Sequence, residues 1–185
     1  MRLGVLVVFM FAASLATSQG PARRGTPSFE QYPISESWSG TAAPIRFRTY
    51  SDRLFRTQFR NAAKEPPNFA GHFRVTSWGC GTVCVEAGIV DLSTGNLLQM
   101  PYSEKPHPIS GWPRGEEKWM VCWSAFRESE TSDTIEMRRD SRLLIVRCAD
   151  AGGKDDDGAH EHTTYFVLEK NRFRKVGDEV GERVF

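Results

Sequence analysis

The chain has 185 residues, in which 24 Lys and Arg stand against 23 Asp and Glu, for a formal net charge of +1. A nearly neutral chain has no general electrostatic reason to bind nucleic acid or an anionic membrane, because both usually attract a strongly basic surface. The length suits one ordinary domain with a hydrophobic core of its own.

The first 16 residues have the pattern of a secretory signal peptide. Met1 and Arg2 supply positive charge, residues 5–13 are an unbroken apolar run, and small residues follow as far as Ala16. The apolar run is well short of the ~20 residues that a transmembrane helix needs. We therefore expect cleavage after Ala16 and a periplasmic or secreted product with no transmembrane segment once the signal is removed.

Residues 17–44 are rich in Ser, Gly, Pro and Thr, and they predict an extended or disordered lead-in. The pattern of residues 45–185 predicts a single β-rich domain that opens with one amphipathic helix. Ser51 is the expected cap of this helix, which carries apolar residues on one side until Pro66 and Pro67 stop it.

The rest of the chain alternates short apolar runs with turn residues, a pattern typical of antiparallel strands. The expected strands are residues 72–78, 84–91, 97–100, 119–126, 134–138, 143–148, 163–168 and 173–176. Turn residues at 91–96, 139–141 and 169–172 predict three local hairpins. The expected fold is mainly β (α+β), an antiparallel meander of about eight strands that forms one twisted sheet or a small sandwich.

Four cysteines follow the signal peptide, at Cys80, Cys84, Cys122 and Cys148. An even number in an oxidising compartment predicts two disulfides, for which three pairings exist. We favour Cys80–Cys84, which are close in sequence, and Cys122–Cys148, which lie in two strand-like segments that could be neighbours in the sheet.

Three short motifs are distinctive: NFAGHF at residues 68–73, WGCGTVC at 78–84 and VDLSTG at 90–95. Together they resemble a family of exported bacterial proteins of unassigned function that share a WGCGT-type turn with a second cysteine. The similarity covers residues 46–176, and it implies a coherent domain but no particular chemistry.

The turn from Gly79 to Cys84 is a candidate site. Gly79 and Gly81 permit a tight turn whose amides could hold an anion, with His72, Trp78 and Thr82 beside it as candidate ligand-binding residues. Alternatively, the glycines only accommodate a short disulfide loop. A catalytic Cys80 with His72 as its base is the enzymatic reading of the same segment.

Three further features each have a functional and a structural interpretation. Asp155, Asp157, His160 and His162 could bind calcium or zinc, although a solvated, flexible loop is the interpretation we favour, and no cofactor is otherwise expected. Arg53, Arg56 and Arg60 form either an anion-binding face or an ordinary wet helix surface. Trp112, in a proline-rich loop, is a candidate exposed contact.

The sequence shows no Ser/His/Asp signature, paired-carboxylate motif or phosphate loop. We therefore favour a non-enzymatic binding protein whose partner is a protein or a cell-envelope component. A small hydrolase or thiol enzyme centred on His72 and the turn from Gly79 to Cys84 is the first alternative. A secreted enzyme inhibitor is the second.

Overall fold

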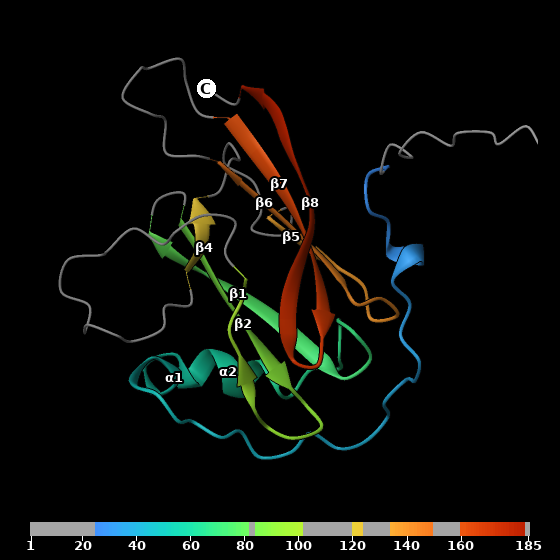
Figure 1. Ribbon diagram of the computed structural model, residues 1–185. Helices are drawn as coiled ribbons and strands as arrows, with labels where there is room; N and C mark the ends of the chain where they lie inside the picture. The colour runs from blue at the N-terminus through green and yellow to red at the C-terminus, as the bar shows by residue number, and fades with distance from the viewer. Residues whose placement is uncertain (1–24, 82–83, 102–119, 124–133, 150–159, 184–185) are drawn as a thin grey trace, which may run out of the picture.

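The computed structural model describes residues 25–81, 84–101, 120–123, 134–149 and 160–183. The predicted signal peptide, its predicted cleavage point after Ala16, and most of the proline-rich and acidic loops lie outside these ranges. The described residues are mainly β, as predicted, with antiparallel strands and little helix (Figure 1).

All eight predicted strand segments contain a strand. The strands are β1 (Phe73–Gly81), β2 (Cys84–Asp91), β3 (Leu97–Leu98), β4 (Met120–Trp123), β5 (Ile135–Met137), β6 (Leu143–Ala149), β7 (His160–Glu169) and β8 (Arg172–Arg183). β7 and β8 are longer than predicted. Their additional residues are mostly polar or glycine. They pair between the two strands although their sequence lacks the apolar alternation that predicts a strand.

The strands form one hydrogen-bonded sheet in the order β1-β2-β4-β6-β7-β8, with β3 paired to β2 and β5 to β6. The two halves of this sheet are joined through β4, which meets β6 at the single residue pair Trp123–Ala149. The β1–β2 pair crosses the β6–β8 half at an angle in Figure 1. The halves are thus continuous in hydrogen bonding, yet they pack against each other in the manner of a small sandwich.

The main core lies between these two halves. Val75, Ala87 and Ile89 of the β1–β2 half share one buried cluster with Leu144 and Phe166 of the β6–β7 half. All are at most 6% exposed. Alternate residues of each strand point into this layer, which is why the strands read as alternating runs in the sequence.

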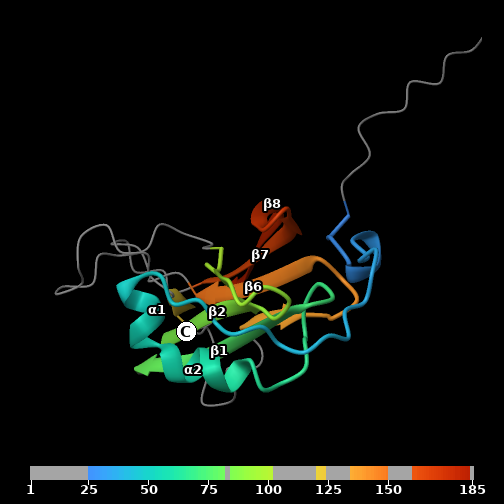
Figure 2. The ribbon, with the colours of Figure 1, turned by 90° about the horizontal axis from the view of Figure 1, so that it is seen from below.

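Two short helices, α1 (Tyr50–Leu54) and α2 (Arg56–Ala62), cover the outer face of β1 and β2, as Figure 2 shows. A single helix was expected, but Phe55 leaves helical geometry at φ −97° and ψ 18°. Its ring lies 4.9 Å from that of Trp78. The cap is Thr49, whose hydroxyl accepts from the Asp52 amide, and not Ser51. In the part of the chain described here, no helix is long and apolar enough to cross a bilayer.

The residues that precede α1 run along the domain as an extended segment, which we call the strap (residues 25–48). Phe29 and Tyr32 of the strap pack on the outer face of β6 and β7, against Leu143 and Val167. The strap is also hydrogen-bonded to the β5–β6 turn, where the Ile34 amide donates to the Asp140 carbonyl at 3.1 Å. It therefore covers a sheet face that would otherwise be open.

Candidate functional site

The loop before β1 (residues 67–72) holds the NFAGHF motif in a backbone shape that local sequence dictates. Ala70 and Gly71 both have positive φ, at 41° and 84°. A Cβ on Gly71 would lie 2.9 Å from the Glu36 carbonyl oxygen of the strap. The Gly71 amide donates to the Arg139 carbonyl at 2.7 Å. The loop, the strap and the β5–β6 turn thus meet at one place, and His72 stands beside it.

The β7–β8 hairpin reaches the same place from the other side. Its two turn residues, Lys170 and Asn171, have φ of 49° and 62°. Positive φ at both central residues defines a type I′ turn, whose twist suits two antiparallel strands. Glu169 pairs with Arg172 across the turn. The side chains of Lys170 and Asn171, at the tip of the turn, are both exposed.

Arg142, at the start of β6, lies where the strap and the hairpin come together. Its amide donates to the Tyr32 carbonyl at 2.8 Å. Its Nε donates to the Pro33 carbonyl at 3.3 Å, and Nη1 donates to the Leu168 carbonyl at 3.5 Å. The guanidinium is half-buried and is held in place by carbonyl groups, which do not neutralise its positive charge. This charge also acts on the nearby Glu169 carboxyl and contributes to lowering its pKa.

Three cavities adjoin at the β7–β8 turn, and together we call them the hairpin cleft. The first, of about 290 Å³, lies between the strap and the turn, and its polar lining is Ser35, Glu36, His72, Arg142, Lys170 and Asn171. The second, of about 770 Å³, adds Glu169, Arg172 and Arg174 to Arg142 and Lys170. The third, of about 580 Å³, lies between the turn and residues 96–101.

The hairpin cleft has an excess of positive charge. Glu169 binds Arg174, with 2.7 Å between Oε1 and Nη2, and this contact lowers the pKa of the Glu169 carboxyl. By contrast, no described carboxylate lies within ion-pair distance of Arg142, Lys170 or Arg172. These cations are left for another negative group to neutralise.

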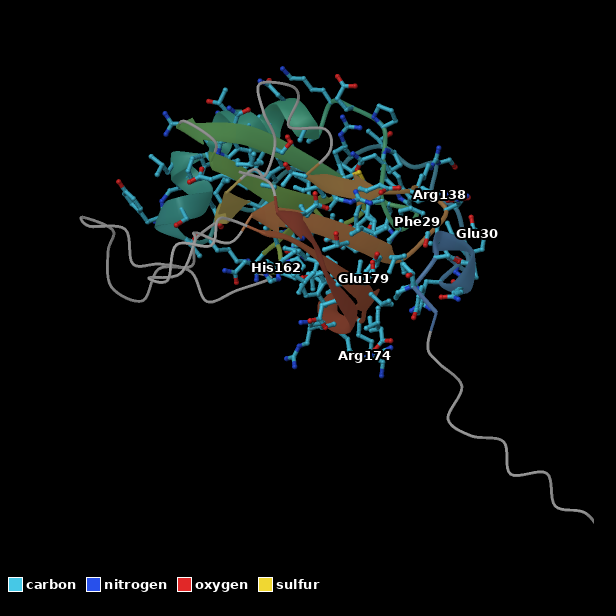
Figure 3. All side chains as sticks on the ribbon, turned by 90° about the horizontal axis from the view of Figure 1, so that it is seen from above. Phe29, Glu30, Arg138, His162, Arg174 and Glu179 are labelled. Carbon is cyan, nitrogen blue, oxygen red and sulfur yellow. The ribbon has the colours of Figure 1, made fainter. Side chains whose placement is uncertain are left out.

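Arg138, by contrast, lies near the strap but is already paired with carboxylates of the protein. Arg138 binds Glu30 at 2.7 Å and Asp140 at 2.8 Å, and it lies over the Phe29 ring. Figure 3 shows Phe29, Glu30 and Arg138 together where the strap meets the β5–β6 turn, with Arg174 well apart on β8. Arg138 therefore fastens the strap, while the hairpin cleft lies elsewhere.

His72 does not form a serine–histidine pair. Its Nε2 lies 3.7 Å from Oδ1 of the buried Asp91. The Ser93 hydroxyl donates to the same Oδ1 at 2.6 Å. A hydrolytic triad needs the histidine between the serine and the carboxylate, but here the carboxylate lies between the other two. Asp91 instead anchors the VDLSTG hairpin, where it also accepts from the Ser93 and Thr94 amides.

His72 and Cys80 are at opposite ends of β1. They are eight positions apart along an extended segment, so their Cα atoms are separated by roughly 26 Å. Gly81 pairs with Cys84 at the far end of the hairpin, whereas the His72 carbonyl accepts from the Leu92 amide at the near end. The structure therefore does not bring His72 to either cysteine as a base.

The other predicted ligand residues do not gather around a site either. Trp78 faces the helices, and its indole N–H donates to Glu86 at 2.6 Å. Gly79 is paired with Val85 in the β1–β2 ladder. The glycines with positive φ in the described residues are Gly71 and Gly95. Thr82 and Trp112 lie outside the described residues.

Of the four cysteines, Cys148 is the one whose side chain the structure describes. It is buried at 3% exposure on β6 and does not carry a free thiol. Cys122 on β4 and Cys148 on β6 lie on opposite sides of the antiparallel pair Trp123–Ala149, so they are diagonal positions on neighbouring strands. The side chains of Cys80, Cys84 and Cys122 lie outside the described part, so both disulfide pairings stay predictions.

The metal and helix-face candidates can be placed in part. Asp155 and Asp157 lie outside the described residues, as does the side chain of His160, while His162 is paired with Cys148 in the sheet. Among the residues that the structure describes, no three potential ligands cluster. Arg53, Arg56 and Arg60 are all exposed, on α1 and α2, and the Arg60 guanidinium lies over the Phe47 ring.

The residues that build the hairpin cleft were mostly missed in the sequence. The turn at 169–172 was predicted, but nothing local shows that Lys170 would lie beside Arg142 and the strap. The alternation of Arg172 and Arg174 on one strand was the available signal, because it places two cations on the same face. Only His72 was named in advance.

The fold and the site define a small antiparallel β domain with an open, basic cleft at one hairpin. No protein-family model, no curated protein and no solved structure matches the chain. The argument for its function therefore depends on the chemistry of the site.

Proposed function

We propose that this chain is an exported, non-enzymatic binding protein that holds an anionic ligand in the hairpin cleft. The observation that carries the proposal is the position of Arg142. This side chain forms the shared wall of the first two cavities, with Lys170 beside it in both. Anion sites in proteins are commonly built from such an immobilised guanidinium with a second cation nearby.

The size and origin of the cleft support binding. Ligand sites are commonly concave and of ~300–1,000 Å³, with a few polar groups that fix orientation. The hairpin cleft is formed by the strap, the loop before β1, the start of β6 and the β7–β8 turn. Its charged side chains are therefore carried by backbone that β-sheet pairing and contacts with the strap hold in place. A preorganised site loses less entropy when the ligand arrives.

Export and disulfides belong to the same proposal. The signal-peptide pattern of residues 1–16 supports export of the mature protein to an oxidising compartment. We propose the pairing Cys122–Cys148, which the neighbouring positions of these residues on β4 and β6 support. The pairing Cys80–Cys84 is proposed with it, because Gly81 and Cys84 are partners at the end of the β1–β2 hairpin.

The test is a titration of the mature protein with a panel of anions, namely inorganic phosphate, sulfate, citrate and galacturonate, followed by isothermal calorimetry. We expect at least one of these to bind, and Arg142→Met to weaken that binding about tenfold, the loss of one charge-assisted contact. Methionine retains the length of the aliphatic stem.

The matched control is Arg56→Met, which removes an exposed arginine from α2, remote from the cleft. It changes the net charge equally and should leave affinity unchanged. The proposal fails if no anion in the panel binds. It also fails if Arg142→Met binds as tightly as the Arg56→Met control.

A further inference from the structure

We propose that the anionic ligand is an acidic polysaccharide, bound as an extended chain that passes around the tip of the β7–β8 hairpin. This inference rests on the proposed function, because it concerns the same cleft. It goes further by naming the class of ligand and the path that the ligand takes. Four observations support it: the continuity of the cavities, the spacing of the cations, a side-chain amide and the strained turn.

The three cavities form one continuous path. The first and second share Arg142, Leu168 and Lys170. The second and third share Arg172 and Phe173, and Asn171 lines both the first and the third. The hairpin tip is therefore lined by cavities on each of its flanks. A single small anion would occupy one of them, whereas a chain can follow all three.

Cations recur along this path rather than converging at one point. Arg142 and Lys170 lie where the first and second cavities join, and Arg172 lies where the second and third cavities join. Arg174 also lines the second cavity, but Glu169 already binds it. A ligand with one compact charge would be served better by cations that converge on it. A polymer with a carboxylate on every sugar fits cations that are spread out.

The third cavity adds a group that suits hydroxyls rather than charges. Asn171 contributes a side-chain amide to its lining, next to Arg172, while the amide of Asn96 is already hydrogen-bonded to Arg48 and Thr94. Amides donate and accept, so they can satisfy both halves of a sugar hydroxyl. Nucleic acid is a weaker candidate because its binding uses aromatic rings that stack on bases. Phe173 is the aromatic residue shared by the second and third cavities, and its ring stacks on Phe69 in the core.

The turn itself carries strain. Lys170 has φ 49°, a left-handed conformation that residues with a Cβ disfavour. Asn or Gly is the usual residue at this position of a type I′ turn. A lysine held there places a cation at the tip against local backbone preference. Strain of this kind is found where a side chain serves a ligand.

The experiment compares ligands of increasing length on the full mature chain. The probes are galacturonic acid and its tetramer and octamer, an unmodified cello-oligosaccharide as the neutral control, and linear polyphosphate matched to the octamer in charge. We expect affinity to rise about tenfold or more from monomer to octamer, since added sugars reach further cations. The neutral oligosaccharide should not bind, and the polyphosphate should bind more weakly than the octamer.

Two variants locate the chain along the path. Arg172→Gln should weaken the octamer about fivefold and the monomer by a smaller factor, because Arg172 lines the second and third cavities but not the first. Lys170→Asn should lower octamer affinity while its urea midpoint stays equal or rises, since asparagine tolerates positive φ. A residue with only a structural role would not separate binding from stability in this direction.

The outcomes distinguish this inference from the proposed function. If the monomer binds through Arg142 as tightly as the octamer, the binding function stands and the extended chain is overturned. If polyphosphate binds as tightly as the octamer, the cleft recognises negative charge alone and the inference of a polysaccharide ligand is overturned. If no anion binds, both proposals fall.

Discussion

Gly95, in the β2–β3 turn, is the position where one added methyl group should disturb the fold most directly. Its φ is 74°, and a Cβ placed on it would overlap the carbonyl oxygen of Pro44 in the strap. The Gly95 carbonyl also accepts from the Arg46 amide at 2.8 Å. The strap therefore crosses the turn so closely that only glycine fits there.

The cost of Gly95→Ala follows from these contacts. The left-handed conformation costs alanine about 1–2 kcal/mol. To relieve the overlap, the strap must move away, which breaks the Arg46 bond and strains the neighbouring bond from the Ala43 amide to the Leu92 carbonyl. Each such bond contributes about 1 kcal/mol. The lower entropy of the unfolded alanine chain offsets less than ~1 kcal/mol, so we expect a loss of about 3 kcal/mol in the free energy of unfolding.

The assay is equilibrium unfolding in urea under oxidising conditions, followed by tryptophan fluorescence. Gly79→Ala is the matched control, because Gly79 is exposed, has no positive φ and would present its Cβ to open space. We expect the control to stay within about 1 kcal/mol of the wild type. If Gly95→Ala were as stable as Gly79→Ala, the close crossing of strap and turn would not constrain the fold.

Two further predictions concern the buried groups of the sheet. Burial raises the pKa of Glu86 above its ordinary value of 4.5, while its bond from Trp78 opposes the shift. The unfolded chain therefore ionises first, so stability is full below pH 4.5 and declines as pH rises through the folded pKa. Glu86→Gln keeps an acceptor for Trp78, and we expect it to be more stable than the wild type at pH 7 but not at pH 4; equal pH dependence in urea unfolding would contradict this. For the cysteines, mass spectrometry of non-reduced peptides should recover Cys148 joined to Cys122, and a link from Cys148 to Cys80 or Cys84 would refute the pairing.

The comparison of sequence and structure shows where local reasoning is reliable. The run at 84–91 was predicted as a strand, and β2 has the same bounds. The turn at 91–96 was predicted from its Asp, Ser, Thr and Gly residues, and the Asp91 carboxylate does hold the Ser93 and Thr94 amides. These features depend on a few adjacent residues, so the sequence contains nearly all the information needed.

The helix shows where local reasoning was incomplete. Thr49 and Asp52 form a capping box, with the cap two residues ahead of the expected cap at Ser51. Phe55 then leaves the helix and packs on Trp78, a residue 23 positions later in the chain. The predicted apolar side is buried at Phe59 and Ala62, but Leu54, which was predicted to belong to it, is 50% exposed. The break could not be read, because it depends on a tertiary contact.

The sequence by itself determined the β class, the number and approximate bounds of the strands, and the three hairpin turns, because alternation and turn chemistry act over a few residues. The tertiary structure alone decided the hairpin cleft. Arg142, Lys170 and His72 come from separate segments, and they meet because the strap and the β7–β8 hairpin pack at the same end of the sheet. Their proximity depends on how the two halves of the sheet and the strap pack around the core. This packing involves residues far apart in the chain, so no short segment of the sequence predicts it.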